Sequence, residues 1–142
     1  MKRLRGKDLS HKNWSEKNLR CADLRMADLS FTDLSYADLT RADLGKAILT
    51  RANLVGASLR GAYLRGAHLT DIKVNWKSHD LVAEILFREA RDDYEKMQFA
   101  GLILIARDWC WDDFLFHPQV PWAVRVLKKW VRPGDNAPDI LK

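Results

Sequence analysis

Aspartate recurs at every fifth position across one stretch of the chain, and four in succession are Asp28, Asp33, Asp38 and Asp43. Carboxylate oxygens are good ligands for Ca²⁺ and Mg²⁺, and paired carboxylates can serve as general acid and base. Such chemistry requires that the fold bring the side chains to one point. The elements that carry the aspartates therefore have to be considered first.

The aspartates belong to a longer repeat with a period of five between Lys7 and Val74. A large apolar residue fills every fifth position of it: Leu9, Trp14, Leu19, Leu24, Leu29, Leu34, Leu39, Leu44, Leu49, Leu54, Leu59, Leu64, Leu69 and Val74. Two residues earlier, from position 22 to position 67, the chain has Ala, or Thr at position 32. A helix repeats every ~3.6 residues and a strand every ~2, so a fixed period of five indicates a solenoid.

Written out, the unit is Ala-Asp-Leu-x-x, as in residues 21–44, CADLRMADLSFTDLSYADLTRADL. This unit resembles the pentapeptide-repeat family over about half of the chain. The resemblance implies a right-handed, four-sided β-helix in which five residues make one side and four units make one coil. Leu and Ala, two residues apart, point to the same side of an extended segment, so we expect both to face inward. The expected fold is a mainly β solenoid plus α, with about three to four coils closed by a C-terminal helical region.

This geometry argues against a metal or acid–base site at the aspartates. On a four-sided coil they lie on four different sides and point outward, so they cannot converge on one ion. Cys21 and Cys110 have neither metal-ligand nor redox spacing, and His11 and His68 are expected to face outward.

One further group could form a small polar pocket, because Arg107 and Asp108 stand beside Trp109 and Trp111. The favoured interpretation is a salt bridge between helices. We therefore expect no catalytic residue, no cofactor site and no metal site, and a protein that is not an enzyme.

Charge is unevenly distributed over the 142 residues, whose net charge is +5. Residues 1–74 hold 14 Lys and Arg against 8 Asp and Glu, whereas residues 75–142 hold 10 against 11. Because positions twenty apart stack in a four-unit coil, basic residues gather over two adjacent sides. They are Arg20, Arg25, Arg41, Lys46, Arg60 and Arg65. A basic face is a handle for nucleic acid or an acidic partner, and Asp23, Asp38 and Asp43 dilute it.

The start of the repeat departs from the pattern, because Lys7, Lys12 and Lys17 hold the inward Ala position. Lysines cannot be sealed in an apolar core, so we expect an N-terminal cap whose lysines block end-to-end stacking, with Trp14 as a lid. Later units place Gly56, Gly61 and Gly66 just before the inward Ala, and a corner with positive φ is expected there.

The period changes after Trp76, so the expected division is a β-helix at 1–76 and a helical cap or interaction region at 77–142. Ser78 predicts the start of a helix over 79–90. Asp92 or Asp93 predicts the start of a second helix, which extends to about Trp109. Pro121 predicts the start of a third helix, which extends to about Val131. Asp112 could begin a short helical turn. The tail after Arg132 is expected to be loose.

The expected function is a non-enzymatic scaffold for protein–protein interaction. Candidate partner-binding residues are the basic set above with Phe31, Tyr36, Trp109, Trp111, Trp122 and Trp130. The partner is an unidentified protein or, through the C-terminal helices, a second copy. Nucleic-acid or acidic-partner binding by the basic face is one alternative. The resemblance offers another, protection or inhibition of DNA gyrase, from which this basic and short coil departs. The basic Met1–Arg5 is followed by no apolar run and Phe99–Ala106 is too short to span a bilayer, so we expect a cytoplasmic protein with no membrane partner.

Overall fold

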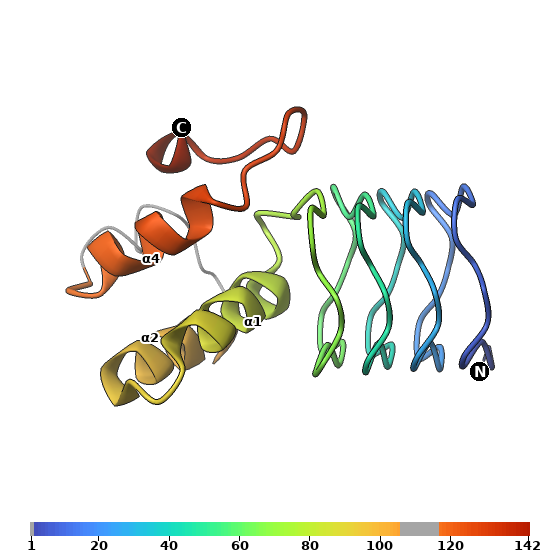
Figure 1. The fold of residues 1–142 in the computed structure, drawn as a ribbon, viewed down its shortest axis with the longest axis horizontal. Helices are drawn as coiled ribbons and strands as arrows, with labels where there is room; N and C mark the ends of the chain where they lie inside the picture. Colours follow the sequence, from blue (N-terminus) through green and yellow to red (C-terminus); the bar gives the residue numbers. More distant parts are fainter. Residues whose placement is uncertain (1, 106–116) are drawn as a thin grey trace.

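The first half of the chain winds into a coil with four five-residue sides per turn (Figure 1). The structure, a computed structural model, describes residues 2–105 and 117–142. Parallel backbone bridges join residues twenty apart, from Arg3 with Asp23 to Asn53 with Lys73. A coil of twenty residues, and hence the stacking of positions twenty apart, is therefore confirmed.

The coil is held by single bridges, and the described residues form no extended strand. On each side one residue pairs with both neighbouring coils. Asp43 donates its N–H to Ala22 and accepts the N–H of Leu24 in the coil before, and it bridges Tyr63 in the coil after, where Tyr63 donates to Ala42 and accepts from Leu44. Two turn residues at each corner interrupt the extended backbone, which explains why the predicted β-solenoid appears as a ladder of isolated bridges.

The interior is the predicted column of leucines. Leu19 through Leu59 in steps of five are at most 1% exposed, and the preceding alanines from Ala22 to Ala57 are equally buried. Val74 closes the series and is also fully buried. Thr32 replaces one inward Ala, and its hydroxyl donates to the carbonyl oxygen of Leu9 at 3.0 Å. A buried hydroxyl is tolerated there because it has this partner.

Every corner described between Gly6 and Asp71 has a residue in the left-handed region, and most of these are not glycine. Gly56 and Gly66 have φ of 70° and 73°, as predicted, but Tyr36 and Lys46 one coil earlier have φ of 57°. At Gly56 a second constraint applies, since a Cβ there would lie 2.5 Å from the ring of Tyr36.

The three lysines of the expected N-terminal cap are exposed, as predicted. The coil includes the residues before them, because Arg3 pairs with Asp23. Lys7, Lys12 and Lys17 are exposed, while Trp14 is half-buried and packs against the core. The lysine backbones remain part of the coil, and the carbonyl of Lys7 accepts the N–H of Asp28.

Helices follow the coil and pack beside its C-terminal end (Figure 1). Helix α1 spans His79–Ala90 and begins as predicted, because Ser78 Oγ accepts the N–H of Leu81. Helix α2 spans Tyr94–Ile105, and Asp93 accepts the N–H of Lys96 at its start. Its predicted extension to Trp109 and the turn at Asp112 lie outside the described residues. None of the described helices is long and apolar enough to cross a membrane.

Helix α4 spans Val120–Lys128 and ends earlier than the predicted Val131. Lys129 and Trp130 instead form a turn, and Trp130 and Val131 pack against the core.

The prediction that the tail after Arg132 is loose is wrong. Ala137 and Leu141 are buried, and a short 3₁₀ helix, η1, spans Asp139–Leu141. Asp135 is also buried, and its carboxylate accepts the N–H groups of Arg132 and Ala137. The tail is ordered because it finds apolar surface and hydrogen-bond partners that composition alone does not reveal.

Candidate partner-binding surfaces

The repeated aspartates serve the backbone of the coil. The carboxylate of Asp28 accepts the N–H of Ser30 two residues on, and Asp33, Asp38 and Asp43 do the same with the residues two after them. This short side-chain hydrogen bond is typical of Asp and Asn in turns, and it orders each corner. Within residues 2–105 and 117–142 no group of His, Cys, Asp and Glu is placed to hold a metal ion.

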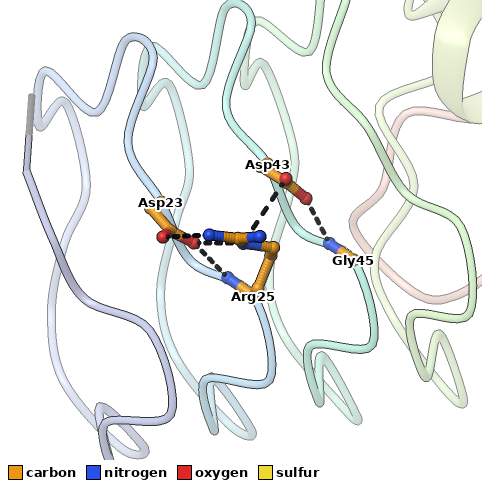
Figure 2. Close-up of polar contacts among 4 residues, drawn as sticks. All are labelled: Asp23, Arg25, Asp43 and Gly45. Carbon is orange, nitrogen blue, oxygen red and sulfur yellow. Dashed lines mark hydrogen bonds and ion pairs between the residues drawn. The ribbon is translucent and has the colours of Figure 1, made fainter.

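Arg25 links two of these carboxylates across successive coils (Figure 2). Its guanidinium donates two hydrogen bonds to Asp23, at 2.8 and 2.7 Å, and lies 3.6 Å from Asp43. Asp43 also accepts the N–H of Gly45. Hydrogen bonds from the Arg25 side chain lower the pKa of Asp23 to about 2. Much of the Arg25 charge is therefore compensated within the coil.

The basic face expected from the sequence is divided by such pairs. All six of its members are exposed, but Arg20 pairs with Asp38 at 3.3 Å and Arg25 pairs with Asp23 and Asp43. The other four make no ion pair with the described residues; they are Arg41, Lys46, Arg60 and Arg65. What remains is a set of short basic patches rather than one continuous surface.

One of these patches surrounds a hollow of about 500 Å³ on the side of the coil. Arg25, Lys46 and Arg65 line it, as do residues that the sequence analysis did not select: Arg5, Met26, Gly45, Tyr63 and Gly66. The period could have revealed them, because 5, 25, 45 and 65 are successive positions of one stack.

Phe31 and Tyr36 are exposed, as predicted, but each is also part of a separate stack along the coil. The ring of His11 lies on that of Phe31 with centroids 4.7 Å apart, and Arg51 covers Phe31 at 5.5 Å. Tyr36 stands at the corner after Phe31, and its ring lies over Gly56 at the equivalent corner of the next coil. The two aromatic residues therefore stand at different corners, and each packs on the neighbouring coil.

The C-terminal tryptophans form less exposed surface than expected. Trp122 and Trp130 are half-buried against the core, and the ammonium of Lys96 lies 5.6 Å from the Trp122 ring. Trp109 and Trp111, like Cys110 and the expected Arg107–Asp108 pair, lie outside the described residues.

The exposed apolar side chains of the helical part stand instead on α2. Tyr94, Met97 and Leu102 are 71%, 41% and 51% exposed. A hollow of about 800 Å³ adjoins them, between α2 and the segment that enters α4. Glu95, Gln98, Leu102, His117 and Gln119 are among the residues that line it. Because α2 is apolar on most of its circumference, its sequence period does not reveal which of these side chains are exposed.

Helix α1 closes the open end of the coil with polar as well as apolar groups. Arg88 donates to the carbonyl oxygens of Ala67 at 2.7 Å and Leu64 at 3.0 Å, and Glu84 holds its Nε at 2.8 Å. Asp80 accepts the N–H of Gly61 at 3.1 Å. The Gly61 N–H and the Ala67 carbonyl thus take partners from α1, whereas the Leu64 carbonyl also accepts the N–H of Ala67 within the coil.

Comparison with known proteins agrees with this architecture. Residues 32–71 match the family model "Pentapeptide repeats" in eight copies. The chain is similar to the crystal structure of HetL, described as a pentapeptide repeat protein involved in heterocyst differentiation regulation, from the cyanobacterium Nostoc sp. strain PCC 7120. Identity is 38% and the TM-score 0.51, over 54% of this chain and 35% of HetL.

A second similar structure is that of alr5209, a pentapeptide repeat protein from Nostoc PCC 7120. Identity is again 38% and the TM-score is 0.50, over 51% of this chain and 60% of alr5209. The chain thus spans about a third of one structure and three fifths of the other. Among curated proteins no match is found, and the C-terminal helical region matches no family.

Proposed function

Residues 32–71 are pentapeptide repeats, and from this premise we propose that the chain is a non-enzymatic scaffold for protein–protein interaction. In this proposal a rigid coil displays outward side chains, and the helical region both closes the coil and docks a partner. The docked protein is first of all a second copy of the chain. We also propose that the coil is right-handed and that the boundary between the coil and the helical region lies between residues 76 and 77.

Rigidity is supported by the pairing of the backbone. Inner sides of the coil bridge the coils before and after them, as Asp43 does with Asp23 and Tyr63. The inward leucines from Leu19 to Leu59 are at most 1% exposed, so the interior of the coil offers no apolar surface to a ligand. Binding to the coil would therefore use its outward side chains, whose positions the bridges fix.

The observation that carries the docking part of the proposal is the apolar surface on α2. Tyr94, Met97 and Leu102 expose about half or more of their area in a region where most large apolar side chains are buried. Exposed apolar clusters on small proteins are typical of interaction sites. The hollow beside Leu102 adds a concave surface into which a partner side chain fits.

Hydrogen–deuterium exchange tests this assignment. Amides would be compared at a low and at a roughly hundredfold higher protein concentration, since association depends on concentration. We expect protection to increase in α2, residues 94–105, and to stay constant in the coil. Protection that increases only in the coil would assign docking to the coil instead.

The alternatives have weaker support. Arg20 and Arg25 are paired with carboxylates, which reduces the charge available for a nucleic acid. No observation favours action on DNA gyrase.

A further inference from the structure

We propose that the hollow above Gly45 binds a carboxylate side chain from an acidic segment of a protein partner. This inference rests on the proposed scaffold function and gives the coil a binding site of its own. It concerns a different surface from α2, so the two can be tested separately.

The hollow exists because a stack of arginines is interrupted. Arg5, Arg25, Gly45 and Arg65 occupy equivalent positions of successive coils, since Gly6 donates its N–H to Arg25 and Met26 donates to Gly45. Neighbouring coils lie ~4.8 Å apart, so no arginine side chain stands between those of Arg25 and Arg65, and the hollow lies over the Tyr63 ring and an Asp43 carboxylate oxygen that take its place. Gly45 is buried, and φ does not require glycine there.

The floor of the hollow is partly aromatic. A Cβ on Gly45 would lie 3.1 Å from Oδ1 of Asp43 and 3.3 Å from the ring of Tyr63, so a carboxylate that already pairs with Arg25 and an aromatic ring both rest against the glycine. Tyr63 is 51% exposed and Met26, across the hollow, is 55% exposed. An acidic side chain entering the hollow would thus contact apolar surface with its methylene groups and cations with its oxygens.

The charges around the hollow are predominantly positive. Four cations line it, and the carboxylates nearest to them are Asp23 and Asp43, which both pair with Arg25. Arg5, Lys46 and Arg65 have no carboxylate oxygen within 4.0 Å among the described residues. A carboxylate in the hollow would gain charge-assisted hydrogen bonds that these side chains do not make within the chain.

A protein segment fits this patch better than a nucleic acid does. The affinity of a polyanion grows with the number of phosphates that are neutralised. Here three unpaired cations, Arg5, Lys46 and Arg65, line one hollow, and the aspartates of the neighbouring sides would repel an extended row of phosphates. One or two carboxylates match both the extent and the charge of the site.

The experiment uses the full-length protein and a fluorescein-labelled hexaglutamate peptide, followed by fluorescence anisotropy at low ionic strength. Lys46→Glu combined with Arg65→Glu should weaken binding at least tenfold. The matched control is Arg41→Glu, because Arg41 is also an exposed cation at a corner with φ of 57° and lies outside the hollow. It should change the dissociation constant less than twofold.

Gly45→Arg distinguishes binding in the hollow from binding by positive charge alone, because it adds a cation but fills the hollow. We expect it to weaken hexaglutamate binding, and circular dichroism would verify that the variant folds. Tighter binding by Gly45→Arg, or equal losses with Arg41→Glu and the double variant, would overturn the proposal. So would tighter binding of a single-stranded oligothymidylate than of hexaglutamate. Absence of wild-type binding would also overturn it, and would leave docking through α2 to be decided by its own exchange experiment.

Discussion

Arg88 on helix α1 donates a hydrogen bond of 2.7 Å to the backbone carbonyl of Ala67 on the last coil. The same guanidinium reaches the carbonyl of Leu64, and Glu84 fixes its orientation. A β-solenoid ends in backbone groups that would normally pair with another coil. Here one helix satisfies them with a side chain while its apolar residues, such as Leu81 and Ile85, cover the leucine column.

Replacing Arg88 should destabilise the whole chain rather than the helix alone. Arg88→Ala removes the side-chain donor of the Ala67 carbonyl, whereas the Leu64 carbonyl keeps the N–H of Ala67, and a partly buried carbonyl left without its donor costs about 1–3 kcal/mol in the free energy of unfolding. Urea denaturation followed by circular dichroism would measure it. Glu89→Ala is the control, because Glu89 is exposed and should change stability by less than about 0.5 kcal/mol. Equal stability of the two variants would show that the cap is only apolar.

The Tyr36 ring over Gly56 predicts a strongly position-dependent cost of alanine. Gly56 and Gly6 both have positive φ, but a Cβ at Gly6 meets nothing within 4 Å, whereas at Gly56 it meets Tyr36. Gly6→Ala should therefore cost about 1–2 kcal/mol from the left-handed backbone alone. Gly56→Ala should cost more in thermal or urea unfolding.

Tyr36→Ala in the Gly56→Ala background should recover that excess. If the two glycine variants lost the same stability, the contact with Tyr36 would not constrain the corner.

Stability should fall in acid through the outward aspartates. The pKa of Asp23 is lowered to about 2 by hydrogen bonds from Arg25, and Ser35 and Thr40 lower those of Asp33 and Asp38. A lowered pKa in the folded state contributes stability that is present above the unfolded value, near 4, and lost as pH falls toward the folded value. Unfolding free energy should thus decrease between about pH 4 and pH 2.

Asp80 has the opposite effect on the pH dependence of stability. Burial raises its pKa, so the protonated form is favoured in the folded state and this group alone adds stability on acidification. Urea unfolding at a series of pH values checks the balance. Asp23→Asn should flatten the profile below about pH 4, and an unchanged profile would exclude Asp23 as a contributor.

The lysines of the first coil predict a solubility effect. Restoring Ala at Lys7, Lys12 and Lys17 recreates the regular unit on a coil that has no preceding neighbour. Because an uncovered edge pairs readily with another, the triple variant should form larger assemblies than the wild type. Analytical ultracentrifugation would detect them. Alanine at Lys46, Lys128 and Lys129, all exposed and away from that end, is the matched control and should leave the distribution unchanged.

The sequence was most informative where one interaction repeats. The inward leucines, the corners at Gly56 and Gly66 and the cap of α1 at Ser78 follow from short-range patterns, and the structure agrees with them. The residues of the basic face were predicted individually, but the ion pairs that they form with aspartates were not. Whether Arg25 meets Asp23 depends on the rotamer that the neighbouring coil permits.

Features that depend on how the helices approach the coil were not predictable in the same way. Arg88 lies on the polar side of α1, and nothing local distinguishes it from Glu89. The burial of Leu141 and the exposure of Leu102 likewise depend on which surface the other elements offer. The tail was predicted to be loose because its Pro, Gly and Asn residues are typical of loops, and tertiary packing overrode that preference.

If α2 docks a second copy of the chain, molar mass by light scattering should depend on the exposed side chain of Leu102. The full chain would be compared with Leu102→Glu and with the exposed-site control Glu89→Gln over a range of concentrations. We predict that the wild type and the control have twice the mass of one chain at high concentration, and that Leu102→Glu stays at the mass of one chain. A wild type that remains monomeric throughout, or a Leu102→Glu variant that dimerises as well as the wild type, would contradict the account.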